Sequence, residues 1–311
     1  MTETLDAAGI LPEEFLRVDG LRLRFVHARP AGARATVVHL HGRGEFVEKY
    51  RETVGDLIGR RFAYASFEWR GQGLSDRLLP AREPGHVDDF AAYLRDLEAA
   101  LRRVAEIGLP RPWVMLAHSM GGQVGLRHLH DRPGRFAAAV MTAPMWGLPL
   151  RGLPVWAAQA IAGSAVRLGA AGRYGPGQRA LDAARCAFEG NPLTGCPERY
   201  ARWQALLTER PELALGGVTY GWLAAALRSI AITRRRGYVE AIRTPVLVCQ
   251  SGLERVVSNR AQARLARRLR HGRLVVFPDA QHEILMERPP VRARFFAVME
   301  EFLGEALAGA A

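Results

Sequence analysis

An apolar run that ends in a short turn of small residues constrains this chain more than any other feature. Residues 112–116 read Pro-Trp-Val-Met-Leu, and residues 117–122 read Ala-His-Ser-Met-Gly-Gly. The run predicts a buried strand, and the segment after it predicts a helix. A serine between such elements, here Ser119, is typical of a nucleophile elbow, where small neighbours permit a strained serine backbone. Alone the pattern is weak, because Ser119 could also be an ordinary helix N-cap.

A nucleophilic serine needs a base and an orienting acid, and each is expected directly after a later strand. Residues 244–250 predict one such strand, and Glu254 lies just past its end. Residues 273–277 predict another strand, which leads to His282. Histidine titrates near neutral pH, which suits a general base. We therefore predict a catalytic triad formed by Ser119, Glu254 and His282.

Simpler interpretations exist for the acid and the base. Glu254 could be a surface carboxylate paired with Arg255 or Arg260, and His282 could be an ordinary loop histidine. Asp279 is a competing acid. It stands so close to His282 in the sequence that we assign it to the shape of the loop.

Acyl transfer also requires two N–H groups that hold the developing oxyanion. The first is expected at Met120, directly after the nucleophile. For the second, residues 35–40 predict a strand that ends in His-Gly-Arg-Gly-Glu at residues 41–45. The glycines let this loop bend, so that the N–H of Arg43 faces the site. We expect His41 to hold the loop by hydrogen bonds and to take no part in catalysis.

Strands and helices alternate along most of the chain, which predicts an α/β fold with a mostly parallel sheet and helices on both faces. A hairpin with an Asp-Gly turn at residues 19–20 comes first. The predicted strands are 36–40, 63–67, 113–116, 138–141, 246–249 and 274–277, and the predicted helices are 46–58, 87–107, 123–129, 260–269 and 291–303.

The alternation stops between residues 145 and 237, where no buried strand is expected. Apolar helical stretches at residues 155–162 and 222–227 lie there between connectors rich in glycine and proline. We predict a helical cap at 145–237, inserted into an α/β core formed by residues 1–144 and 238–311. Such a cap would cover the nucleophile and enclose a substrate tunnel. The alternative is that its apolar residues only pack the cap against the core.

Several segments resemble the serine α/β-hydrolases of the monoacylglycerol lipase and lysophospholipase group. In the first half these are HGRGE at 41–45, WRGQGLSD at 69–76 and HSMGG at 118–122. Segments 215–222, 250–260 and 282–287 resemble bacterial lysophospholipases that associate with the inner membrane. The resemblance implies an α/β-hydrolase fold, a glutamate as triad acid, and neither cofactor nor metal. Ala117 and Arg43 depart from the usual residues, but the oxyanion hole uses only backbone N–H groups.

The same resemblance implies a carboxylic-ester hydrolase that acts on a single-chain lipid. A lysophospholipid is the expected substrate, and a monoacylglycerol or a simple ester is the alternative. Acyl transfer to an alcohol stays open because it shares the acyl-enzyme, and so does a catalytically silent scaffold that binds lipid or protein. Dehalogenase and epoxide hydrolase chemistry is disfavoured, since it needs a carboxylate in place of Ser119.

Substrate contacts are predicted in the segment that follows the strand at 138–141. Its apolar residues could form a hydrophobic entrance, and they are Met145, Trp146, Leu148 and Leu150. Arginines of the cap could hold a lipid phosphate through forked hydrogen bonds. These include Arg151, Arg167, Arg173 and Arg202, for which a solvated surface position is the alternative.

The chain of 311 residues carries a net charge of +12, and Lys49 is its only lysine. This charge suits an anionic membrane surface, and without a nucleic-acid-binding motif we expect no nucleic acid partner.

No stretch approaches the ~20 apolar residues that span a bilayer, and the N-terminus is not typical of a signal peptide. Cys186, Cys196 and Cys249 lack metal-ligand spacing. We expect a cytoplasmic protein, peripheral on the inner face of the cell membrane, and leave its oligomeric state open.

Overall fold

An eight-stranded sheet forms the centre of the molecule, and the computed structural model describes residues 12–150, 152–182 and 186–308. The strands are β1 (Glu13–Val18), β2 (Leu21–Ala28), β3 (Ala35–Leu40), β4 (Phe62–Phe67), β5 (Trp113–His118), β6 (Ala138–Thr142), β7 (Val246–Ser251) and β8 (Gly272–Phe277). Their order in the sheet is β1-β2-β4-β3-β5-β6-β7-β8. Strand β2 runs antiparallel to β1 and β4, and all other neighbours are parallel. The predicted α/β class with a mostly parallel sheet is confirmed.

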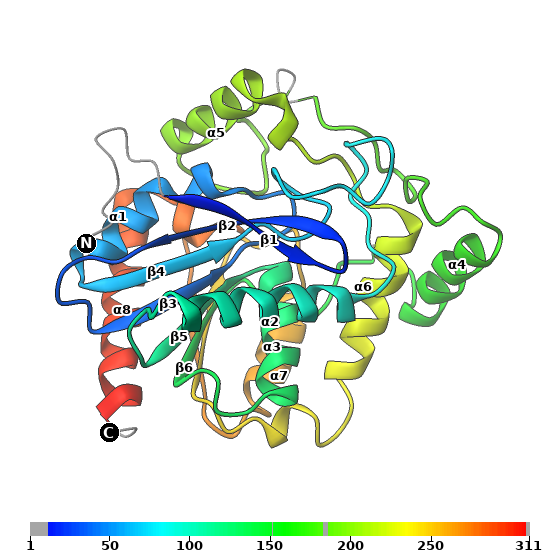
Figure 1. The fold of residues 1–311 in the computed structure, drawn as a ribbon. Helices are drawn as coiled ribbons and strands as arrows, with labels where there is room; N and C mark the ends of the chain where they lie inside the picture. Colours follow the sequence, from blue (N-terminus) through cyan, green and yellow to red (C-terminus); the bar gives the residue numbers. More distant parts are fainter. Residues whose placement is uncertain (1–11, 151, 183–185, 309–311) are drawn as a thin grey trace.

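Helices lie on both faces of this sheet (Figure 1). They are α1 (Arg51–Gly59), α2 (Phe90–Glu106), α3 (Met120–Asp131), α4 (Val155–Arg167), α5 (Pro197–Glu209), α6 (Tyr220–Thr233), α7 (Asn259–Ala266) and α8 (Pro289–Ala308), with 3-10 turns η1 (Val47–Tyr50), η3 (Pro211–Leu213), η4 (Val239–Ala241) and η5 (Ile284–Met286). The helix predicted at 46–58 begins as the 3-10 turn η1 before α1. The helix predicted from residue 87 begins only at Phe90, because the Asp89 side chain accepts the N–H of Ala91 and caps it.

The alternation of side chains along each buried strand divides the interior into two apolar layers. In β5, Met115 and Ala117 pack toward α2, α3 and α7, whereas Val114 and Leu116 pack toward α1 and α8. A strand that is covered on both faces reads as a continuous apolar run, which is why the segment before Ser119 was recognisable.

The first hairpin has the turn that its sequence predicts. Asp19 and Gly20 connect β1 to β2, and both have positive φ, at 52° and 81°. Two positive φ values belong to the type I′ turn, whose twist matches that of the flanking strands. The Asp-Gly prediction is therefore confirmed.

The segment between β6 and β7 contains α4, α5 and α6. As predicted, its described residues form no strand, and only isolated bridges such as Tyr174 with Thr219 occur. Helices α4 and α6 match the predicted apolar stretches and lie side by side, whereas α5 was not predicted (Figure 1). Tyr200 and Trp203 of α5 pack against Phe46, the residue directly before η1. The assignment of residues 145–237 as a separate cap stays a prediction.

Candidate active site

Ser119 occupies a strained turn between β5 and α3. Its φ is 49°, a value that non-glycine residues rarely adopt and that is typical of functional sites. The Ser119 N–H donates to the Thr142 carbonyl at 3.1 Å, and the Met145 N–H donates to the Ser119 carbonyl at 2.9 Å. These bonds to the end of β6 and the segment after it hold the turn in its strained conformation.

The two glycines after Ser119 are required by close packing. A Cβ atom on Gly121 would lie 2.2 Å from the carbonyl oxygen of Leu40, at the end of β3. On Gly122 it would lie 2.6 Å from Pro144 Cβ. The start of α3 therefore touches the ends of neighbouring strands. Ala117 lies within buried β5, before the turn.

The three predicted triad residues are joined by hydrogen bonds. His282 Nε2 lies 3.0 Å from Ser119 Oγ, and His282 Nδ1 lies 2.8 Å from Glu254 Oε2. The other oxygen of Glu254 accepts the N–H groups of Val256 and Val257, at 2.6 and 3.1 Å. Residues that follow β5, β7 and β8 are thus joined in one chain of hydrogen bonds.

The surroundings of Glu254 favour its ionised form. Burial raises the pKa of this carboxyl, but the hydrogen bond to His282 and the two backbone N–H donors outweigh burial, so its pKa lies below the usual value. A carboxylate at Nδ1 favours the tautomer with a proton on Nδ1, which leaves Nε2 free to accept from Ser119. Arg255 does not pair with Glu254, because its side chain donates to the Asn191 carbonyl at 2.6 Å. Asp279 is exposed, and the carboxylate at His282 Nδ1 is that of Glu254.

The loop at residues 41–45 carries the predicted oxyanion donor Arg43. Gly42 N–H donates to the Glu45 carboxylate, and Gly44 N–H donates to Gln72 Oε1 at 2.7 Å, so the backbone is held on both sides of Arg43. The N–H groups of Arg43 and Met120 form no hydrogen bond within the described part of the chain. Met120 is the first residue of α3, where the helix dipole favours negative charge.

The side chains of Arg43 and His41 hold the 41–45 loop against neighbouring segments. Arg43 Nη1 donates to the Gly216 carbonyl at 2.8 Å, and the guanidinium lies 5.8 Å from the Trp222 ring, so it ties the loop to the segment between β6 and β7. Burial lowers the pKa of Arg43 to about 10. His41 Nε2 lies 2.9 Å from Ser66 Oγ, and its ring stacks on Tyr50, which confirms the predicted structural role.

A buried ionic cluster, which the sequence pattern does not predict, joins the 41–45 loop to the segment after His282. Lys49 Nζ lies 2.8 Å from Glu45 Oε1 and 2.6 Å from Glu283 Oε1. Glu45 belongs to the 41–45 loop, and Glu283 directly follows His282. The single lysine of the chain therefore connects the two segments. Its occurrence four residues after Glu45 was the only signal in the sequence.

The same cluster contains the one group of potential metal ligands found among the described residues. Glu45, His118 and Glu283 place their ligand atoms within 4.8 Å of one another. Both carboxylates are bonded to Lys49 Nζ, so the ammonium supplies the positive charge that a metal ion would bring. His118 instead contacts Thr142 Oγ1 at 3.0 Å through Nδ1.

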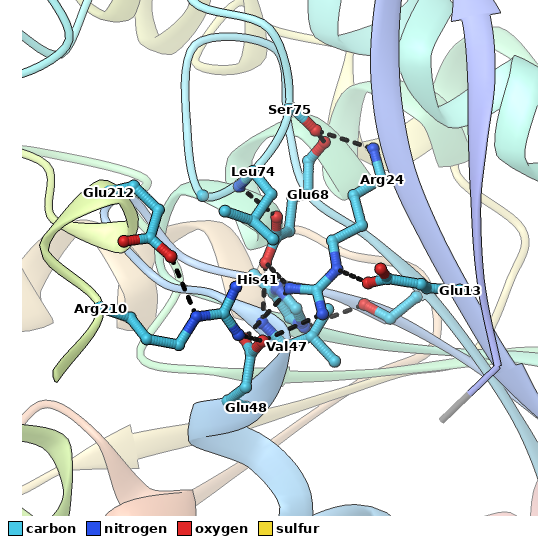
Figure 2. Close-up of polar contacts among 12 residues, drawn as sticks. Glu13, Arg24, His41, Val47, Glu48, Glu68, Leu74, Ser75, Arg210 and Glu212 are labelled. Carbon is cyan, nitrogen blue, oxygen red and sulfur yellow. Dashed lines mark hydrogen bonds and ion pairs between the residues drawn. The ribbon is translucent and has the colours of Figure 1, made fainter. Parts of the chain in front are cut away.

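A second buried network, shown in Figure 2, anchors the turn η1 that follows the 41–45 loop. Glu68 accepts the Val47 N–H at 3.0 Å, and Arg24 reaches Glu68 at 3.2 Å and Glu48 at 2.9 Å. Arg210, at the end of α5, bonds the same Glu48 at 2.6 Å. Strand β2 and the segment between β6 and β7 are thereby connected beside the site.

The predicted substrate-binding residues fall into two places. Met145 and Trp146 are buried in the core behind the elbow, and Trp146 Nε1 donates to the Gly122 carbonyl at 3.2 Å. Leu148 and Leu150 line a groove beside α7 whose lining does not include the triad. Their contact with substrate stays a prediction.

The predicted phosphate-binding arginines are also dispersed. Arg202 is bonded to Glu52 at 3.1 Å, so its charge is already compensated. Arg167 and Arg173 are exposed, and their side chains bond to none of the residues the structure describes. Arg151 lies outside the described residues.

Two buried histidines, His41 and His118, are expected to lower the free energy of unfolding at acidic pH. Burial lowers the pKa of both His41 and His118 to about 4, against 6.5 for an ordinary histidine. Between these pH values the unfolded chain binds more protons than the folded one, so stability falls as the pH drops. The cost approaches roughly 3 kcal/mol per histidine near pH 4. Urea unfolding at several pH values measures it, and an unfolding free energy independent of pH below 6.5 would contradict it.

Comparison with known proteins identifies the family of this chain. A family model described as "Serine aminopeptidase, S33" matches residues 31–289. Lysophospholipase L2 of Escherichia coli strain K12 is 34% identical over 291 residues, which cover 90% of this chain and 83% of that protein. Human monoglyceride lipase is 28% identical over 131 residues, or 42% of each chain.

Solved structures show the same fold. A soluble variant of monoglyceride lipase from Saccharomyces cerevisiae, in complex with a substrate analog, matches with a TM-score of 0.74 at 18% identity, covering 96% of this chain and 95% of that one. The predicted α/β-hydrolase fold is therefore confirmed. Because the family model and the E. coli relative each cover most of the chain, the protein belongs to the Hydrolase_4 family of serine α/β-hydrolases.

Proposed function

We propose that this protein is a serine carboxylic-ester hydrolase that releases the fatty acid from single-chain lipids, with lysophospholipids as preferred substrates. The observation that carries the proposal is the hydrogen-bonded line from Ser119 through His282 to Glu254. The similarity to lysophospholipase L2 over 90% of the chain supports the choice of substrate class. The comparison also includes monoglyceride lipases, so a monoacylglycerol is the competing substrate.

In the proposed acylation step, Ser119 Oγ attacks the ester carbonyl while His282 Nε2 takes the hydroxyl proton. Glu254 keeps the imidazole oriented and stabilises the positive charge that the ring acquires. The protonated His282 then gives this proton to the ester oxygen of the leaving group, which is the glycerophosphodiester of a lysophospholipid or the glycerol of a monoacylglycerol. The fatty acyl group stays bound to Ser119 as an ester.

The negative charge on the carbonyl oxygen is held by the N–H groups of Met120 and Arg43. Such donors, fixed before the reaction begins, commonly supply the largest single stabilisation of the transition state. Met120 offers its N–H from the start of α3, and the bonds to Gly42 and Gly44 fix the backbone around Arg43.

Water completes the reaction in a second step. His282 removes a proton from a water molecule, the resulting hydroxide attacks the acyl carbonyl, and the proton on His282 returns to Ser119 as the fatty acid leaves. Acyl transfer would use the hydroxyl of a second lipid in place of water.

We also propose that the region around α4 contacts an anionic membrane surface, at the inner face of the cell membrane. Its exposed apolar side chains include Trp156 at 72% and Leu168 at 84% exposure, together with Leu153, Val155 and Ile161. Exposed apolar patches mark interaction surfaces, and the net charge of +12 favours anionic lipid. Within the described chain, no helix is both long and apolar enough to cross a membrane.

Fatty-acid release from lysophosphatidylethanolamine and from a monoacylglycerol of equal chain length tests the substrate class. We expect kcat/KM to be about tenfold or more higher for the lysophospholipid, the effect of one good polar contact to the phosphate. Equal or faster release from the monoacylglycerol would assign a general single-chain lipase instead. A diacyl product formed with added lysolipid would assign acyl transfer.

A further inference from the structure

A groove separate from the triad lies between α6 and α7. Its volume is about 340 Å³, within the range of small-molecule sites. The apolar part of its lining comes from the segment after β6, from α4, α6 and α7, and includes Leu148, Leu150, Val155, Leu227, Ile230 and Leu265. Neither Ser119, Glu254 nor His282 belongs to the lining.

Three arginines share this groove, and its lining includes no acidic residue. Arg234 comes from the end of α6, and Arg260 and Arg264 come from α7. All three are exposed, and none forms a side-chain hydrogen bond or ion pair with another residue in the described ranges. Nearby Arg268 differs, because it pairs with Glu240 at 2.9 Å. The positive charge of the groove is therefore uncompensated by the protein.

The placement of these charges on α7 is unfavourable without an anion. Arg260 lies in the first turn, where the helix dipole is positive and acidic residues are preferred, yet this turn contains none. Arg264 follows four residues later on the same face, and like charges at this spacing repel each other. An anion between the guanidinium groups would relieve both interactions.

We propose that the α6–α7 groove binds a fatty acid. The carboxylate lies among Arg234, Arg260 and Arg264, whose planar forks match it in geometry and charge. The alkyl chain lies along the apolar lining toward Val155, where the exposed apolar surface of α4 begins. The choice of a fatty acid rests on the proposed function, which releases one, whereas the groove itself does not depend on it.

Calorimetric titration with laurate, below the concentration at which it forms micelles, tests the proposal. The active site is first blocked with an alkyl phosphonate that reacts with the nucleophilic serine. We expect one laurate site to remain. Arg260→Glu combined with Arg264→Glu should weaken it by about tenfold or more, since two charge-assisted hydrogen bonds are lost. The neutral 1-monolaurin should bind about tenfold or more weakly, for the same reason.

Arg267→Glu is the matched control, because Arg267 is exposed at the end of α7 and does not line the groove. It should leave laurate affinity within about twofold, as expected for an isolated surface charge. An equal loss in this control, or disappearance of the site after serine blocking, would overturn the proposal. Failure of Ser119 to react with the phosphonate would contradict the proposed hydrolase function but not the groove. The laurate affinities of the arginine variants would then decide whether the groove binds a fatty acid.

Discussion

Replacing Ser119 with alanine is expected to lower kcat for ester hydrolysis by about 10⁴-fold or more, because no acyl-enzyme can form. The change removes only the Oγ atom that contacts His282, and leaves the backbone bonds to Thr142 and Met145 in place. The unfolding free energy should therefore stay close to that of the wild type. Fatty-acid release and labelling by a serine-directed phosphonate are the measurements.

Ser164→Ala is the control for this variant, since Ser164 is exposed on α4, away from the triad. It should keep both activity and labelling. Retention of activity within about tenfold in Ser119→Ala would show that another group is the nucleophile, because loss of a true nucleophile costs far more.

Replacing Lys49 with methionine is expected to destabilise the fold by about 3–5 kcal/mol, the usual cost of removing one partner from a buried ion pair. Burial lowers the pKa of Lys49, but Glu283 and Glu45 outweigh it, so its pKa lies above the usual value and it is charged. Without the ammonium, two buried carboxylates lie close together with no cation between them. Burial already raises the pKa of Glu283, so in the variant Glu283 can take up a proton and lose its charge. This proton uptake would keep the destabilisation near the lower end of the range.

The Lys49 variant should also lose activity while it is still folded, because Lys49 connects the 41–45 loop to the segment after His282. Urea unfolding and kcat are measured on the same sample. Lys49→Arg keeps the charge and should restore part of both. Lys49→Met combined with Glu283→Gln should be less destabilised than the sum of the single changes. Wild-type stability of Lys49→Met would mean that the cluster is not a buried ion pair.

Much of the fold and of the triad could be predicted because the relevant information is local. Strand β5 is buried on both faces and therefore reads as an apolar run, and the small residues after Ser119 follow from the contact of α3 with Leu40 and Pro144. Parallel strands end at the same edge of the sheet, so residues that follow strand ends are brought together. For this reason the positions of Glu254 and His282 after β7 and β8 predict that their side chains lie near Ser119.

Contacts between distant segments leave no such periodic signal. Lys49 and Glu283 are 234 positions apart, and only the packing of the 41–45 loop against the segment after His282 brings them together. Packing likewise decides that Leu148 faces the α6–α7 groove, whereas Trp146, two residues earlier, is buried behind the elbow. Backbone periodicity and turn chemistry, which act between neighbours, are written in the sequence. Partners for buried charges and the walls of grooves depend on how separate elements pack, and only the tertiary structure decides them.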